Sequence, residues 1–179
     1  MDYYKQKQFL AEVDGADKIR GKIEKWEAHK RGVLHRGYTV VLTVGDLVLL
    51  QHRKHPVFDN VFDLSFSSHQ ILKENILQDD ISAIYEGLLR EWLIKEEEIV
   101  NKPLFMRTIY YKEKDIKSEY TEHEIDYIYH VELNKIPFFS LDFAYGFISI
   151  KKSEIHNKIQ HLQYPTAPWV KELLKQRLF

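Results

Sequence analysis

The chain has 179 residues, a length that favours one ordinary domain with a sizeable buried core. Its 26 basic and 27 acidic residues leave a formal net charge of −1, which argues against a nucleic-acid partner. Cysteine is absent, so disulfides, thiolate metal sites and cysteine nucleophiles are excluded. Apolar runs are too short to span a membrane, and the N-terminal segment lacks the apolar core of a signal peptide. We therefore expect a cytoplasmic protein without a membrane partner.

Two hairpins are the first elements predicted along the chain. Residues 9–13 and 18–23 flank a polar turn that contains glycine. Residues 38–44 and 47–53 flank a Gly-Asp pair and form the stronger hairpin. Their near-continuous valine and leucine indicate a sheet that is buried on both faces.

A helix over residues 80–97 follows, with Asp79 or Asp80 as its N-cap. Its apolar stripe has helical spacing and consists of Ile81, Ile84, Tyr85, Leu88 and Trp92. The remaining predicted elements are strands at 104–112, 122–132 and 144–150, and helices at 153–162 and from Pro168 onward. This order predicts a mixed sheet with helices laid on it, in a single domain over residues 1–179.

Five potential metal ligands gather in two short runs and one isolated position. His29 and His35 stand six residues apart, and Glu122 and Glu124 alternate in a strand-like run, which places both carboxylates on one face. His69 lies between these runs in the sequence. Carboxylates favour Mg²⁺ or Mn²⁺ and imidazoles admit Zn²⁺, so together they predict a divalent metal centre. The alternative is that the histidines are surface residues and the glutamates line the solvated face of an edge strand.

Five motifs occur along the chain in an order typical of one enzyme family. They are EAHKRGVLHR, LVLLQHR, SSHQ, EHEIDYIY and PTAPWV, and they extend the likeness from about residue 9 to Trp169. With these motifs the chain resembles type I isopentenyl-diphosphate isomerase, a branch of the Nudix superfamily. The resemblance implies the Nudix fold, of α/β (α+β) class, with a mixed β-sheet sandwiched between helices. It also implies a metal-dependent enzyme that interconverts isopentenyl and dimethylallyl diphosphate by protonation and deprotonation.

The resemblance assigns a role to each matching residue. It implies a Mg²⁺ ion held by His29, His35, His69, Glu122 and Glu124. It implies acid–base chemistry by Glu124, with assistance from Tyr111 or the adjacent Tyr110. The diphosphate contacts that it implies are Lys25, Arg53 and Arg90, with Lys54 or His55 as further candidates. Trp169 would stabilise a carbocation with its aromatic face, although a tryptophan there could equally be a core anchor.

Ser67 is the first departure from the family pattern, because it stands where the family has its catalytic cysteine. A thiol has a reference pKa of about 8.5 and can exchange protons near neutral pH, whereas a serine hydroxyl does not titrate usefully. We expect Ser67 to relay a proton through water at best, and proton transfer to be slower.

The second departure is a degenerate Nudix box. With the box anchored on Arg90-Glu91, the positions of its metal-binding glutamates hold Ile94 and Lys95. With the box anchored on Ile99, Glu96 keeps one acidic position and is a candidate magnesium ligand; its alternative role is a surface charge. A pyrophosphatase needs clustered glutamates there to hold magnesium and activate water. The pattern therefore weighs against hydrolysis.

Three functions remain open at this point. The first is the isomerase, acting on a small-molecule diphosphate as a monomer or homodimer. The second is a Nudix hydrolase of a diphosphate-containing metabolite. The third is a catalytically weakened, diphosphate-binding relative in which the metal site survives.

Overall fold

The computed structural model describes residues 2–176, which fold around a nine-stranded mixed sheet. The strands of this sheet are β1 (Phe9–Val13), β2 (Ile19–Glu24), β3 (His35–Val44), β4 (Leu47–Arg53), β5 (Phe62–Asp63), β6 (Phe66–Ser68), β9 (Leu104–Lys114), β10 (Thr121–Glu132) and β11 (Ala144–Lys151). A separate small hairpin pairs β7 (Leu72–Lys73) with β8 (Ile76–Leu77). The helices are α1 (Lys25–Arg31), α2 (Asp80–Trp92), α3 (Ile155–Lys158) and α4 (Pro168–Lys175). Short 3₁₀ turns cover Tyr3–Lys5, Glu96–Glu98, Lys152–Glu154 and Ile159–His161.

The long strand β3 organises the sheet. The path of neighbouring strands runs β11-β4-β3-β1-β2, and β10 pairs with both β3 and β9. The pairing of β10 with β3 is parallel, whereas its pairing with β9 is antiparallel. This register sets Glu124 opposite His35 on one side and opposite Tyr111 on the other.

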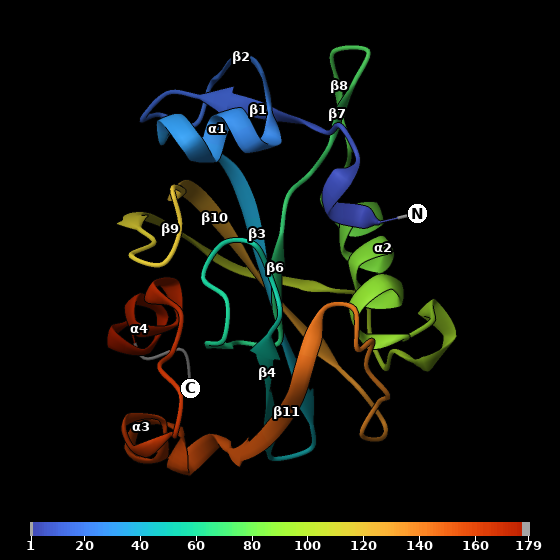
Figure 1. Ribbon diagram of the computed structural model, residues 1–179. Coiled ribbons are helices and arrows are strands. Elements are labelled where there is room, and N and C mark those ends of the chain that lie inside the picture. The colour runs from blue at the N-terminus through green and yellow to red at the C-terminus, as the bar shows by residue number, and fades with distance from the viewer. Residues whose placement is uncertain (1, 177–179) are drawn as a thin grey trace.

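Helices cover both faces of the sheet (Figure 1): α2 lies on one side, and α3 and α4 lie on the other. Successive residues of β3 point to opposite faces, so Val40 and Leu42 pack in the core beneath α2 while Val41 packs in the core beneath α3 and α4. All three side chains are fully buried. The predicted mixed sheet between helices, with both faces buried, is confirmed.

Helix α2 is shorter than predicted. Asp79 is its N-cap and accepts a hydrogen bond from the Ser82 backbone N–H, but the helix ends at Trp92 instead of residue 97. Leu93 adopts a left-handed conformation with φ of 53°, and the Ile94 N–H bonds back to the Leu88 carbonyl. The Ile94 side chain is buried after this reversal, in the same core cluster as Trp92.

The other predicted elements lie close to their expected positions. Both N-terminal hairpins and the three later strands are present within a few residues of the predicted bounds. The helix predicted at about 153–162 is present in place but is not one α-helix, since only Ile155–Lys158 is α-helical and a 3₁₀ turn flanks it on each side. Helix α4 begins at Pro168 as expected. Within residues 2–176, no helix combines the length and the apolar character that crossing a lipid bilayer requires.

Candidate metal centre

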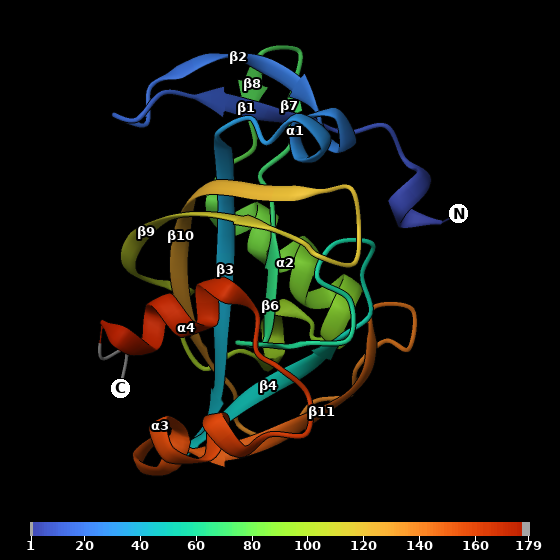
Figure 2. The same cartoon turned by 60° about the vertical axis from the view of Figure 1, so that its left-hand side comes forward.

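The five predicted ligands come from four elements that meet at one end of β3. His29 lies on α1, His35 begins β3, His69 follows β6, and Glu122 and Glu124 lie at the start of β10. Figure 2 shows α1 beside this end of β3, with the beginning of β10 beneath it. The parallel pairing of β10 with β3 brings the glutamate run to the first histidine of the strand.

The side chains of these residues converge in a buried cluster. One ligand atom each from His29, His35, His69 and Glu122 lies within 4.8 Å of the others. The Nε2 atom of His29 is 3.2 Å from Glu122 Oε2. Glu124 joins the same cluster, because its Oε1 atom is 2.8 Å from His69 Nε2 and 3.4 Å from His35 Nε2. All five residues are less than 10 % exposed, so the two glutamates do not line the solvated face of an edge strand.

Two of the histidines are oriented by the main chain. His29 Nδ1 lies 2.6 Å from the Lys25 carbonyl, and His35 Nδ1 lies 2.7 Å from the Val33 carbonyl. A carbonyl only accepts, so each Nδ1 carries the proton and each Nε2 is left with a free lone pair. This is the arrangement by which outer hydrogen bonds orient metal-binding imidazoles.

Buried polar atoms without a hydrogen-bond partner mark the middle of the cluster. Among the described residues they include Nε2 of His29, His35 and His69, and Oε2 of Glu122. Leaving such atoms unpaired is costly in a protein interior. A divalent cation would satisfy all of them at once, so the donor set fits Mg²⁺, Mn²⁺ or Zn²⁺.

Electrostatics within the cluster keep its central carboxylate ionised. Burial alone would raise the pKa of Glu124, but the adjacent imidazoles of His35 and His69 hold this pKa well below its ordinary value. Burial lowers the pKa of His69 to about 4, while Glu124 and Glu122 outweigh burial and raise the pKa of His35. An ionised carboxylate beside neutral His69 is the protonation state that binds a cation.

Glu124 is also held from its other side. The Tyr111 hydroxyl donates to Glu124 Oε2 across the β9–β10 pair. Burial and the Glu124 charge raise the Tyr111 pKa well above its ordinary value, so the hydroxyl keeps its proton. A Cβ atom added at Gly37 would stand 2.6 Å from Glu124 Oε1, so this glycine leaves the space that the carboxylate fills.

Two of the predicted diphosphate-binding cations lie beside the cluster. Lys25 and Arg53 are 3 % and 4 % exposed and line the same small cavity as His69 and the two glutamates. The Lys25 ammonium lies 5.0 Å from the Tyr3 ring centroid and 4.9 Å from that of Trp26. Arg53 forms an ion pair with Asp63 at 3.0 Å. Trp169 lines the cavity too, with its ring 5.5 Å from that of Tyr111.

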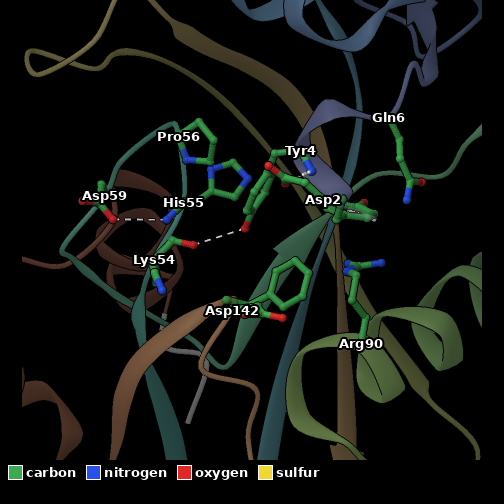
Figure 3. Close-up of a pocket in the computed structure, with 11 residues that line it drawn as sticks. Asp2, Tyr4, Gln6, Lys54, His55, Pro56, Asp59, Arg90 and Asp142 are labelled. Atoms are coloured by element: carbon green, nitrogen blue, oxygen red, sulfur yellow. Dashed lines mark hydrogen bonds between the residues drawn. The ribbon is translucent and has the colours of Figure 1, made fainter.

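The other two predicted cations face a separate outer chamber. Lys54 and Arg90 line a hollow of about 890 Å³ at the surface, whereas the cavity at the metal cluster measures about 10 Å³. Tyr3 and Tyr4 line both spaces. Figure 3 shows the Tyr4 side chain reaching from the N-terminal turn toward His55, with its hydroxyl bonded to the Lys54 carbonyl. His55 also lines both spaces, so the two tyrosines and His55 lie between the candidate metal cluster and the outer chamber.

Ser67 lines the inner cavity, but its hydroxyl is already engaged. It donates to Asp63 Oδ2 at 3.0 Å and lies 2.8 Å from the Thr39 hydroxyl. Thr39 in turn donates to Asp126. Burial and the nearby Glu124 charge raise the Asp126 pKa well above its ordinary value. None of these groups gives Ser67 the acidity of a thiol.

Glu96 requires a correction. The prediction of a magnesium ligand placed it on an extended α2, but α2 ends at Trp92 and Glu96 lies exposed on the 3₁₀ turn Glu96–Glu98. It is not part of the buried cluster. The helix places a different carboxylate at the cavity: Glu91 is 7 % exposed and lines it. The sequence signal for Glu91 was the Arg90-Glu91 pair, on which the degenerate Nudix box can be anchored.

Comparisons with known proteins show a shared fold and little shared sequence. No family model matches the chain, and no curated protein matches it. A protein of Deinococcus radiodurans of known structure superposes with a TM-score of 0.66 at 13% identity, over 94% of this chain and 98% of its own. A MutT NUDIX hydrolase from Burkholderia pseudomallei superposes with a TM-score of 0.58 at 13% identity, over 80% of this chain and 97% of its own.

A third similar structure is a larger enzyme. It is a bifunctional NMN adenylyltransferase/ADP ribose pyrophosphatase from Francisella tularensis, with a TM-score of 0.55 at 14% identity over 79% of this chain and 40% of its own. Another structure of that enzyme contains AMP and a Mn ion. Sequence identities of this size establish the architecture alone. The predicted fold is confirmed: this chain has the Nudix fold.

Proposed function

We propose that this protein is a divalent-metal-dependent enzyme that acts on a small metabolite containing a diphosphate. The observation that carries the proposal is the buried cluster of unpartnered histidine Nε2 atoms and carboxylates, with two buried cations in the same cavity. Carboxylates and imidazoles bind the metal, and Lys25 and Arg53 supply positive charge for phosphate oxygens. We assign the ligands as His29, His35, His69, Glu122 and Glu124, with Mg²⁺ as the expected ion and Mn²⁺ or Zn²⁺ as substitutes.

Hydrolysis of the diphosphate is the reaction that we place first. The proteins similar in fold include a hydrolase and an ADP ribose pyrophosphatase, and this supports hydrolysis over isomerisation. A bound divalent cation would polarise the phosphoryl group. The lysine and arginine would hold the phosphate oxygens, and Glu91, whose carboxylate lines the cavity, would take the proton from an attacking water. In this scheme α2 contributes one carboxylate, and the remaining acidic groups come from β10.

Isomerisation of isopentenyl diphosphate to dimethylallyl diphosphate is the second candidate, and a specific observation favours it. Trp169 and the Tyr111–Glu124 pair line the same cavity, so an aromatic face and an acid–base pair stand beside the metal cluster. Ser67 weakens this candidate, since its hydroxyl is bonded to Asp63 and cannot replace a thiol.

One assay distinguishes the two reactions. Purified protein with Mg²⁺ is incubated separately with ADP-ribose and with isopentenyl diphosphate, and the products are read by ³¹P and ¹H NMR. Release of phosphate or nucleoside monophosphate supports hydrolysis, whereas a shifted double bond with an intact diphosphate supports isomerisation. His35→Ala should abolish either activity, and His161→Ala, at an exposed histidine, should not. A protein that binds the metal yet changes neither substrate would contradict both reactions.

Ser67→Cys sharpens the test of the isomerase candidate. A positioned acid–base group typically contributes ~10²–10⁴-fold, so a thiol at this position should raise double-bond migration measurably. Ser67→Ala is the control, because it removes the hydroxyl and preserves the small volume. Equal migration in the two variants would exclude a proton-transfer role for this position.

A further inference from the structure

Asp63 is a fully buried carboxylate that collects hydrogen bonds from four donors. Its Oδ1 atom accepts from the Leu64 backbone N–H at 2.8 Å and from the Trp169 indole N–H at 2.7 Å. Its Oδ2 atom accepts from Arg53 Nη1 at 3.0 Å and from the Ser67 hydroxyl at 3.0 Å. The residue is 0 % exposed and stands on the two-residue strand β5.

Three of these donors belong to side chains that line the metal cavity. Arg53 ends β4, Ser67 lies on β6 and Trp169 lies on α4, so Asp63 joins segments that are far apart in the chain. Asp63 itself does not line the cavity. A single carboxylate therefore accepts hydrogen bonds from three residues of the cavity wall.

The Arg53 guanidinium is held at both Nη atoms, whereas its third nitrogen has no partner within residues 2–176. Its Nη1 bonds to Asp63, its Nη2 lies 3.4 Å from the Val57 carbonyl, and its carbon stands 5.2 Å from the Trp169 ring centroid. Its Nε atom is buried and has no hydrogen-bond partner among residues 2–176. A buried N–H without a partner is an unused donor, and the cavity is where a ligand oxygen would meet it.

We propose that Asp63 is a positioning residue that fixes Arg53 and Trp169 for a phosphate-bearing ligand in the cavity. The identity of that ligand rests on the proposed function, whereas the positioning of the two side chains does not. Asp63 supplies two acceptor oxygens and a negative charge that offsets the buried guanidinium. Because Ser67 also donates to Asp63, the serine hydroxyl is held as part of this support.

Asp63→Asn tests the proposal on the intact chain. The amide keeps one acceptor for Trp169 and Leu64, but its NH₂ group cannot accept from Arg53 or Ser67. We expect the affinity for inorganic pyrophosphate with Mg²⁺, measured by calorimetry, to fall at least tenfold. If substrate turns over, KM should rise more than kcat falls. The Trp169 indole ¹H–¹⁵N resonance should move, and that of Trp26, which bonds to the Tyr4 carbonyl, should not.

Asp14→Asn is the matched control. Asp14 also accepts from backbone N–H groups and from an arginine, Arg20, but in the turn between β1 and β2. This variant should leave pyrophosphate affinity within twofold. A double-mutant cycle with Arg53→Gln adds a second check. In the Arg53→Gln background, Asp63→Asn should lower the pyrophosphate affinity by less than a further twofold. A further tenfold loss in that background would mean that Asp63 merely holds the fold, and would overturn the proposal.

The Arg53 guanidinium can also be measured by NMR in the unmutated protein, so this test does not require any variant to fold. A clamped guanidinium rotates slowly about its Nε–Cζ bond and gives separate Nη resonances for Arg53, whereas averaged resonances would overturn the proposal. Failure of the parent to bind pyrophosphate would instead count against the proposed function. An unchanged Trp169 resonance in Asp63→Asn, together with unchanged pyrophosphate affinity, would overturn the positioning role alone.

Discussion

Two acidic segments of this chain are similar in composition, but one is buried and the other is exposed to solvent. Glu122 and Glu124 on β10 are buried against three histidines, whereas Glu96, on the turn Glu96–Glu98 after α2, is exposed to solvent. The difference comes from the backbone that carries them. Strand alternation directs both β10 carboxylates inward. There the His35 imidazole from the paired strand β3, His29 from α1 and His69 after β6 compensate their burial.

An acidic motif forms a metal-type site only where side chains that can share a cation, such as the three histidines here, are buried with it. On α2 the helix ends at Trp92, so the acids that follow never reach the sheet. Both carboxylates of the buried cluster lie on a strand, β10.

Glu124→Ala should have the largest effect on metal binding. The carboxylate lies within 3.4 Å of two histidines and accepts from Tyr111, so its loss removes a ligand and leaves a void among buried polar groups. We expect Mn²⁺ affinity, measured by calorimetry, to fall by more than about 100-fold, since even outer hydrogen-bond partners of metal ligands are worth 10–100-fold. Affinity within threefold of the parent would remove Glu124 from the ligand set.

Gly37→Ala should have an intermediate effect through the same carboxylate. The added methyl would stand 2.6–2.7 Å from the three terminal atoms of the Glu124 side chain, so the carboxylate must shift. We expect a loss of about tenfold in Mn²⁺ affinity, in the range of changes that misorient a ligand. Gly146→Ala is the control, because a Cβ there meets nothing within 4 Å. Equal affinities in the two variants would contradict the crowding argument.

His55 is a half-buried histidine whose ring has no acidic partner within residues 2–176. Burial and the charges of Arg53 and Lys25 lower the His55 pKa well below its ordinary value, so the folded protein holds the ring neutral. A lowered folded pKa means that the unfolded chain binds more protons, so stability is lost as pH falls below about 6.5. The loss approaches about 1.4 kcal/mol per pH unit for one proton.

His55→Gln should therefore flatten the pH dependence of stability between about pH 6.5 and 5. The measurement is urea unfolding of metal-free protein at several pH values, and the lowered pKa of His69 remains in both proteins as a common background. Parallel stability curves for the parent and the variant would show that His55 titrates normally in the folded state.

Much of the fold was predictable from the sequence, because hydrophobic periodicity encodes which faces are buried. The near-continuous apolar runs around Val40 and Leu49 indicated strands covered on both sides, and both residues are fully buried. The end of α2 was not predictable by periodicity. Leu93 takes a positive φ at this end, and Ile94 is buried in the core just after it. The free energy gained by burying Ile94 depends on the sheet against which the core packs.

The residue types in the sequence predicted the members of the candidate metal cluster, but they did not predict the residues that surround it. Spacing and alternation indicated His35 and Glu124, and strand pairing sets them side by side. Asp63 carries no sequence signal of its own, since its partners come from three other elements. The placement of Tyr3 and Tyr4 between the two spaces likewise depends on where the N-terminal turn packs, which local sequence does not determine.

The smallest effect is expected for the double variant Glu96→Gln and Glu97→Gln. Both positions are exposed, and neither side chain belongs to the buried metal cluster, so removing two charges should change Mn²⁺ affinity and catalytic rate less than twofold. Glu98 is left in place because it accepts from the Lys95 backbone N–H and pairs with Lys135 at 3.4 Å. Calorimetry and the product assay measure both quantities under the conditions used for Glu124→Ala. A loss of tenfold or more would mean that this turn closes onto the site during catalysis. The contrast between the two acidic segments would then hold only for the resting protein, and hydrolysis assisted by acids after α2 would regain support.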